Sequence, residues 1–309
     1  MSDRPSHAVP SLVRSLRLAT HVLLAGILLC TAAARGAVND PLLYEVTSDT
    51  TTVYLFGTIH VGAPSMYPLN AKVQAAFDRS QALALEADPT DQAAIVAAMT
   101  QALYAPPDSL ERHIGPELYQ QVMKVAPGYG LPVDYAKLLR PALLAMVLSM
   151  SEVQRLGYDA ALGLDIHFAK SAKSTGKPIV QLESMAEQIA MFNGMPAQAQ
   201  ESMLRATLDG LSDARMAGEL DELVAAWSKG DPDAMLHAIE REFEGLDEQT
   251  ARTLFARVYD ERNQAMAAKV DTLLRGASVH FVAIGAGHLA GPTGLPRLLE
   301  KMGFKVRRL

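Results

Sequence analysis

The sequence predicts an α/β fold in which a mixed sheet of two related halves is covered by helices, with a long helical section between the halves. Three observations predict it. Short apolar runs that suit buried strands are separated by stretches with helical periodicity. A strand followed by Gly-x-x-His occurs near each end of the chain. Apolar residues make up 49% of the chain and charged residues 20%, without low-complexity linkers, so we expect one mature domain.

The first elements form a hairpin, a helix and a third strand. Residues 42–46 and 53–56 are rich in strand-forming side chains and are separated by the polar turn TSDTT. Residues 70–79 have a helical pattern. Residues 82–88 are a short apolar run that ends in acids, which is typical of a buried strand.

The middle of the chain is mostly helical. Residues 91–150 have a helical pattern that is interrupted at APPD and APGYGLP, where proline and glycine break helices. We then expect a helix at 164–174, a strand at 179–182, Met- and Ala-rich helices over 184–229 and one long amphipathic helix at 251–275. The last elements are a core strand in SVHFVAIGAGH, a helix at 295–302 and a short closing strand in GFKVRRL.

The first 37 residues have the pattern of a secretory signal peptide. Arg14 and Arg17 form a basic segment, residues 22–30 are apolar, and the small residues of TAAARGA suit cleavage within residues 34–38. We therefore predict one domain over 38–309 and a periplasmic or secreted location. The alternative is a retained membrane anchor, but the apolar run is shorter than the ~20 residues that a spanning helix needs. Because no later segment is apolar enough to span, we expect no stable membrane insertion after cleavage.

Charge and cysteine content exclude several classes of function. The net charge is −6, and loss of the signal peptide, with its four arginines and one aspartate, changes it to −9. An acidic chain without a basic surplus does not suit nucleic acid. The only cysteine, Cys30, lies in the signal peptide, so the mature chain has no disulfide, thiolate nucleophile or cysteine-rich zinc site.

Two similar segments near the ends of the chain carry the main functional signal. VYLFGTIHVGAPSMYPL and HFVAIGAGHLAGPTGLP each contain an apolar strand, Gly-x-x-His, an apolar residue, a glycine and a loop with proline and leucine at its end. In open sheets of this kind, ligands bind at the carboxyl ends of strands. Gly57 and Gly285 let the backbone turn or approach a ligand closely. One such motif is more often structural, but His60 and His288 together suggest metal binding or proton transfer.

Two glutamates occupy comparable positions at the ends of predicted strands. Glu86 follows LAL, and Glu183 follows IVQL. Together with His60 and His288 they form a set of imidazoles and carboxylates that suits a divalent metal, such as zinc, manganese, cobalt or iron. The alternative for each glutamate is a carboxylate at a helix N-terminus, stabilised by the helix dipole.

The long predicted helix places a charge on its apolar side. Arg262 lies four residues after Val258 and four before Met266, and therefore on the apolar stripe. An inward-facing charge needs a partner, which an acidic site or a substrate anion would supply, unless the side chain reaches the rim. Asn263 follows it directly. Asp165 is either an acceptor that orients a histidine or an acid in the first turn of a helix.

The chain resembles the TraB/PrgY/GumN family, which includes the Tiki proteins. The resemblance covers essentially the whole predicted mature chain and is carried, in this order, by FGTIHVG, LALEAD, GLDIHF, GKPIVQLES, ERNQAMA and GAGHLAGPTGLP. The family's fold is similar to that of the erythromycin esterase and ChaN group. The resemblance thus implies an α/β core of two related halves with the site between them.

The resemblance also implies roles for particular residues. Tiki proteins are membrane-tethered metalloproteases that use manganese or cobalt and require the Gly-x-x-His histidines and a glutamate. Carried over to this chain, these residues are His60, His288 and Glu86, and the family's other polar positions match Glu183, Asp165, Arg262 and Asn263. The zinc-protease signature His-Glu-x-x-His is absent. Other relatives are known for effects on pheromone shutdown or polysaccharide production, so membership does not define a reaction.

The leading hypothesis is an exported metal-dependent hydrolase of the peptidase type, with a peptide or a small molecule as its substrate. His60 and His288 would hold the metal with Glu86 or Glu183, and the remaining glutamate would act as general base. Arg262 would stabilise the oxyanion. One alternative is a binding protein for haem, metal or peptide without turnover, which a Soret band would reveal in the haem case. The other is metal-free hydrolysis with a histidine base, which would survive a chelator.

Overall fold

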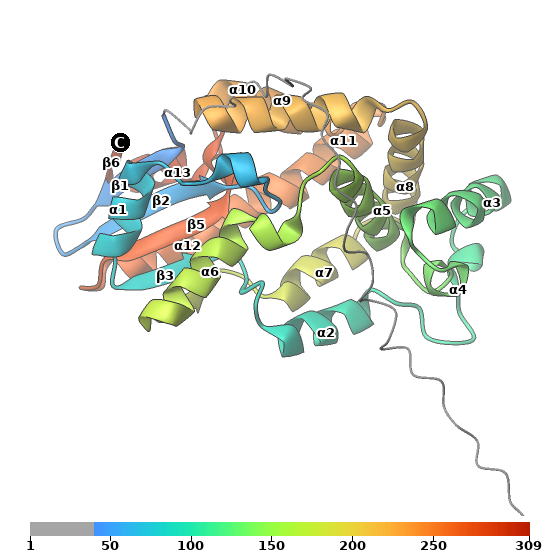
Figure 1. Cartoon of the computed structure of the whole chain (residues 1–309), viewed down its shortest axis with the longest axis horizontal. Helices are drawn as coiled ribbons and strands as arrows, with labels where there is room; N and C mark the ends of the chain where they lie inside the picture. The colour runs from blue at the N-terminus through green and yellow to red at the C-terminus, as the bar shows by residue number, and fades with distance from the viewer. Residues whose placement is uncertain (1–39) are drawn as a thin grey trace, which may run out of the picture. The chain divides into compact units, whose positions relative to one another are not determined.

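The structure is a computed structural model that describes residues 40–309. The predicted signal peptide and the predicted domain start at residue 38 lie outside the described residues. Six described strands form one mixed sheet covered by helices (Figure 1), which confirms the predicted fold class. The strand order across the sheet is β4 (Ile179–Gln181), β3 (Ala82–Leu85), β5 (His280–Gly285), β2 (Thr52–Thr58), β1 (Leu43–Thr47) and β6 (Lys305–Arg308).

The two strands that carry the Gly-x-x-His motifs are parallel neighbours at the centre of the sheet. β2 and β5 pair so that Gly57 lies opposite Ile284 and Thr58 lies opposite Gly285. Both motifs therefore leave the sheet at the same edge and side by side. β3 pairs parallel to β5 on its other side, and β4 pairs parallel to β3. The four strands whose ends carry the predicted site residues are thus adjacent, although they are far apart in the sequence.

Helices bury the central strands, which explains why those strands have continuous apolar runs instead of alternation. On one face, α1 (Ala71–Arg79) and α6 (Leu164–Thr175) contribute Phe77 and Phe168 to an aromatic cluster with Phe56 and Phe281 of the sheet. Figure 1 shows α6 in front of the sheet. β2 also contacts α12 (Glu261–Leu274), and β1 contacts α13 (Leu295–Lys301).

The long helical section between β3 and β5 has a hydrophobic cluster of its own, which includes Leu118, Leu139, Leu144 and Leu204. Its remaining α-helices are α2 (Gln92–Gln101), α3 (Pro116–Val125), α4 (Val133–Ala136), α5 (Pro141–Arg155), α7 (Met185–Asn193), α8 (Ala197–Ser212), α9 (Arg215–Lys229), α10 (Pro232–Arg241) and α11 (Glu248–Phe255). No helix in residues 40–309 is long and apolar enough to cross a membrane.

Two predicted elements differ from the structure. The helix expected over residues 251–275 consists of α11, a π-helical segment at Ala256–Asp260 and α12. A π segment contains an extra residue, often at a functional site, and the regular helical stripe of the sequence does not predict it. The strand expected over residues 82–88 ends at Leu85, and the chain bends at Glu86 and Ala87.

Candidate functional site

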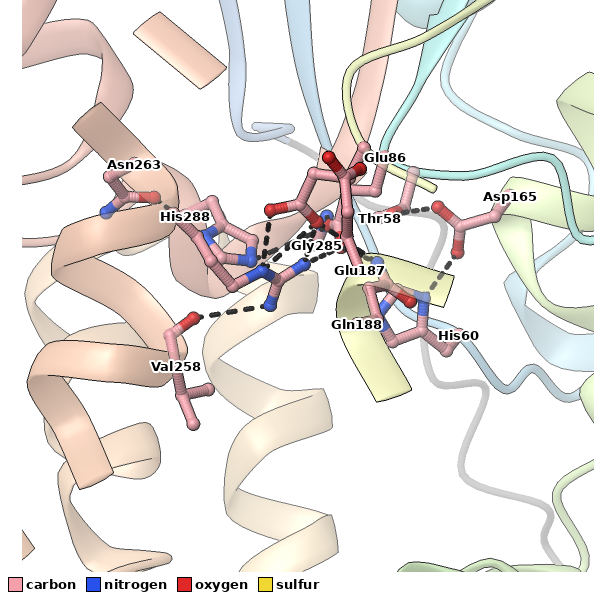
Figure 2. A network of polar contacts seen from close by, with 12 residues as sticks. Thr58, His60, Glu86, Asp165, Glu187, Gln188, Val258, Asn263, Gly285 and His288 are labelled. Carbon is pink, nitrogen blue, oxygen red and sulfur yellow. Dashed lines mark hydrogen bonds and ion pairs between the residues drawn. The ribbon is translucent and has the colours of Figure 1, made fainter. Parts of the chain in front are cut away.

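The residues that the sequence singles out lie together at the carboxyl ends of the central strands (Figure 2). Gly285, the last residue of β5, is at the middle of this cluster. A Cβ atom on Gly285 would lie 3.2 Å from Glu86 Oε1, 3.5 Å from His60 Nε2 and 3.6 Å from His288 Cδ2. These three side chains therefore surround one small space that only glycine leaves open. Gly57 has a packing role, since a Cβ there would lie 3.1 Å from Ala286.

His60 is held by a buried carboxylate on α6. Its Nδ1 lies 2.8 Å from Asp165 Oδ2, and Thr58 donates to Asp165 Oδ1 at 2.7 Å (Figure 2). The Asp165 carboxylate raises the pKa of His60 to about 9. His60 is therefore an imidazolium at neutral pH. With Nδ1–H donating to Asp165, its Nε2–H is available to the central space, and 62% of the side chain is exposed.

His288 is held by an amide on α12. Its Nδ1 lies 2.6 Å from Asn263 Oδ1, while Asn263 Nδ2 donates to the carbonyl of Thr293 at 3.0 Å. The carbonyl fixes the amide orientation, so Asn263 offers His288 an oxygen and Nδ1 must carry the proton. Burial lowers the pKa of His288 to about 4. At neutral pH its Nε2 is therefore an unprotonated nitrogen, 3.7 Å from Glu86 Oε1.

The two glutamates are joined by backbone and by one arginine. Glu183 N–H donates to the carbonyl of Glu86 at 2.6 Å, which places the segments after β3 and β4 side by side. Arg262 Nη2 donates to Glu86 Oε2 at 2.5 Å and to Glu183 Oε2 at 2.7 Å, and its Nε donates to Glu183 Oε1 at 2.9 Å. Gln188 adds a donor to each carboxylate. The partner expected for the inward-facing arginine is thus this pair of carboxylates.

Charge pairing makes the burial of these groups possible. The side chains of Glu86, Glu183 and Arg262 are 7%, 11% and 16% exposed. Burial alone would raise the pKa of Glu86, but the charges around it and the Gly285 N–H, which donates to Oε1 at 2.6 Å, lower that pKa. The two carboxylates raise the pKa of Arg262 above its usual value despite burial. Glu86 is therefore a carboxylate, and both of its oxygens are engaged.

The donor types suit a divalent metal, but their placement does not form a metal-binding group. His60 Nε2, His288 Nε2 and Glu86 Oε1 face one space. Glu86, however, already accepts from Gly285 and from Arg262. Within residues 40–309, no three His, Cys, Asp or Glu side chains are arranged to hold a metal ion. Metal binding therefore stays a prediction.

The arrangement provides an acid and a base on either side of one space. When two side chains of the same type have pKa values shifted in opposite directions, one is suited to donate a proton and the other to accept one. His60, beside a carboxylate, carries the proton that an acid donates. His288, buried and oriented by a neutral amide, has the free nitrogen that a base needs.

Three polar residues of this cluster were not predicted from the sequence. Thr58 donates to Asp165, and Gln188 donates to the two glutamates. The ring of Tyr259 lies against the ring of His288, with 5.4 Å between the ring centroids. Thr58 lies within the first Gly-x-x-His motif, which is a signal that could have been used. Tyr259 matched the apolar stripe of a regular helix in the sequence. The π segment that places it beside the site has no sequence pattern that would have predicted it.

A cavity of about 420 Å³ opens beside His60. Its walls come from the loop after β2, from α5, α7, α8, α9 and α10, and from the segment between α10 and α12. Val258, whose carbonyl accepts from Arg262 Nη1 at 3.2 Å, also lines it. This volume falls in the range of small-molecule and side-chain binding pockets. The cluster around Gly285 therefore has an adjoining space large enough for part of a substrate.

Comparison with known proteins finds one matching family and several similar proteins. The TraB/PrgY/gumN family profile matches residues 42–308. Protein YbaP of Escherichia coli K12 is 26% identical over 247 residues, covering 80% of this chain and 87% of YbaP. Metalloprotease TIKI1 of Danio rerio is 25% identical over 301 residues, and the Amphimedon queenslandica Metalloprotease TIKI homolog is 25% identical over 190 residues. The matches span 60% and 37% of these two longer proteins.

Proposed function

Because this chain belongs to the TraB/PrgY/gumN family, we propose that it is a hydrolase whose reaction takes place at the cluster around Gly285. The names of the two TIKI relatives, both metalloproteases, support a peptide bond as the bond that is cleaved. The predicted signal peptide supports action in the periplasm or outside the cell.

One observation carries this proposal. Two histidines, each anchored at Nδ1 by a separate acceptor, present Nε2 to the same space, and a carboxylate fixed by Arg262 forms its third side. Two histidines with a purely structural role would not need to face one space with pKa values shifted in opposite directions. Preorganised acid–base pairs of this kind contribute about 10²–10⁴-fold to the rate of a reaction.

The residues of the chain account for each proton in hydrolysis. His288 Nε2 accepts a proton from the attacking water, and Asn263 Oδ1 stabilises the imidazolium through Nδ1–H. The hydroxide adds to the acyl carbon. The bond between this carbon and the leaving nitrogen then breaks as His60 Nε2–H gives its proton to that nitrogen, and Asp165 keeps the neutral ring in place. Proton exchange with water then restores both histidines.

Arg262 supports this scheme in two ways. It neutralises the buried carboxylates, and it has one N–H left to donate. Of its five N–H groups, Nε–H and both Nη2 hydrogens go to the glutamates and one Nη1 hydrogen goes to Val258. The remaining Nη1–H can stabilise negative charge on the acyl oxygen.

Steady-state kinetics on the mature protein tests the proposal. Peptide mixtures and activated esters are incubated with wild type, His60→Ala, His288→Ala and the control His237→Ala, a histidine that is 78% exposed. We expect both site variants to lose about 10²–10⁴-fold in kcat while circular dichroism shows that they keep the wild-type fold, and the control to be unchanged. Full activity in either site variant would refute the proposal. A chelator arm with metal analysis then separates metal-dependent from metal-free hydrolysis.

Ligand binding without turnover is a second candidate. The cavity beside His60 favours it, since its volume suits an apolar ligand. In this case wild type binds a ligand but yields no product with any substrate. A Soret band in the purified protein would identify that ligand as haem.

A further inference from the structure

The cavity beside His60 has an apolar wall rich in methionine. Met150, Met195, Met203 and Met216 line it, together with Phe192 and Leu220. Methionine is flexible and polarisable, so a methionine wall adapts to apolar groups of different shape. The sequence showed three of these residues only as part of a Met-rich helical region. In the structure Met150, Met203 and Met216 come from three different helices and Met195 from the connection between α7 and α8, and all four line the same space.

The charged residues at this cavity are predominantly acidic. Arg215 and Arg241 line it, and each pairs with two carboxylates: Arg215 with Asp213 and Glu219, and Arg241 with Glu222 and Glu244. Glu219, Glu244 and Glu242 line the cavity as well. The two arginines and the imidazolium of His60 are therefore outnumbered by five carboxylates. The surplus gives the cavity a negative potential, which attracts a cation.

Glu242 is the carboxylate that most needs a cation. Within the described part of the chain, its side chain forms no ion pair and accepts no hydrogen bond. Glu242 is an exposed residue at this cavity, where partial desolvation and the Glu219 carboxylate raise its pKa. A positively charged group between these two carboxylates would stabilise both ionised forms.

This acidic part of the cavity is close to the reaction centre. The charge of Glu242 raises the pKa of Tyr259, after the larger effect of burial, and the Tyr259 ring lies against His288. On another side the cavity is bounded by His60 and Val258. A group bound between the methionines and the acids would therefore lie next to His60, one of the side chains around Gly285.

We propose that the cavity selects a peptide segment in which an apolar side chain is next to an ammonium group. The apolar side chain occupies the methionine wall, and the ammonium pairs with Glu242 and Glu219. Either a lysine or a free amino terminus supplies that ammonium. As a statement about substrate, this inference rests on the proposed function, but binding can be measured without turnover.

Methyl NMR of protein labelled with ¹³C-methyl methionine tests this inference. Three peptide amides serve as probes: Ac-Leu-Lys-Leu, with a lysine, Leu-Gln-Leu, with a free amino terminus, and Ac-Leu-Gln-Leu, without a cation. We expect the methyl signals of Met150, Met195, Met203 and Met216 to move, whereas those of Met66 and Met302 stay in place because neither lines the cavity. At least one cationic peptide should bind about tenfold more tightly than the neutral one.

A variant that removes the charge of Glu242 tests whether this residue causes the preference for cationic peptides. Glu242→Gln should reduce it to about twofold or less, whereas Glu248→Gln, an exposed glutamate outside the cavity, should leave it intact. Equal affinity for the three peptides in wild type, or shifts outside the four methionines, would overturn the inference even if the variant did not fold. Selective binding without any cleavage would instead support the cavity assignment and refute the hydrolase.

Discussion

Gly285→Ala separates the chemistry of the site from the stability of the fold. The backbone at Gly285 has φ −49° and ψ 132°, which alanine adopts without strain. The new methyl group would lie 3.2 Å from Glu86 Oε1 and 3.5 Å from His60 Nε2, within the space where water and substrate must meet. We therefore expect the fold to persist while the reaction is blocked.

The expected magnitudes follow from these contacts. Replacing glycine by alanine stabilises the folded protein by about 0.4–1 kcal/mol, because it reduces the conformational entropy of the unfolded chain. This gain offsets much of the cost of moving Glu86 by a few tenths of an ångström. We expect the free energy of unfolding to change by about 1 kcal/mol or less, equivalent to roughly 2–4 °C in Tm. A reacting group displaced by 1 Å can cost about 10²-fold, so kcat/KM should fall at least that much.

Thermal unfolding and kinetics on the same preparation measure both effects. Gly218→Ala is the matched control, because a Cβ there meets no atom within 4 Å and the residue lies inside α9. The control should keep full activity and gain about 0.5–1 kcal/mol in stability. The reasoning is refuted if Gly285→Ala keeps activity within about threefold of wild type, or if it unfolds.

Three further predictions follow from the same cluster. The pKa of His60 is raised from 6.5 to about 9, so the stability that its pairing with Asp165 contributes is complete below pH 6.5 and is lost as the pH rises through 9; in Asp165→Asn, unfolding free energies at these two pH values should no longer show this loss. Asn263→Ala should lower kcat by about 10–100-fold and change the tautomer of His288 seen by ¹⁵N NMR, and an unchanged tautomer would contradict its orienting role. Arg262→Ala leaves two buried carboxylates without their cation and should cost about 3–5 kcal/mol in chemical denaturation; a loss below about 1 kcal/mol would show that the pairing is weak.

The sequence was informative about the site because the site is built from strand ends. Two Gly-x-x-His motifs after apolar runs predicted that His60 and His288 would lie at one sheet edge, and the parallel pairing of β2 with β5 explains why both lie beside Gly285. The same logic applies to Glu86 and Glu183, which follow the two neighbouring strands.

Contacts between distant segments could be predicted only in part. The position of Arg262 on an apolar stripe required a partner, but the sequence allowed an acid, a substrate or the rim. Packing of α12 against the sheet selects the two carboxylates. The roles of Asp165 and Asn263 were likewise open, since only the folded chain shows which histidine each one contacts.

The π segment and the cavity had no sequence signal. Tyr259 matches the regular apolar period of a helix, and its position beside His288 depends on the local change to π geometry. The cavity arises where helices far apart in the sequence fail to fill the space between them. Such space depends on side-chain packing, which periodicity does not describe.

Hydrolysis in H₂¹⁸O tests the central claim most directly. The mature protein, wild type or His288→Ala, is incubated with a peptide mixture, and new carboxyl groups are detected by mass spectrometry. The account predicts that wild type incorporates ¹⁸O into new carboxyl groups and that His288→Ala, folded as judged by its Tm, does not. Absence of labelled product with wild type, or equal labelling by the variant, would contradict it.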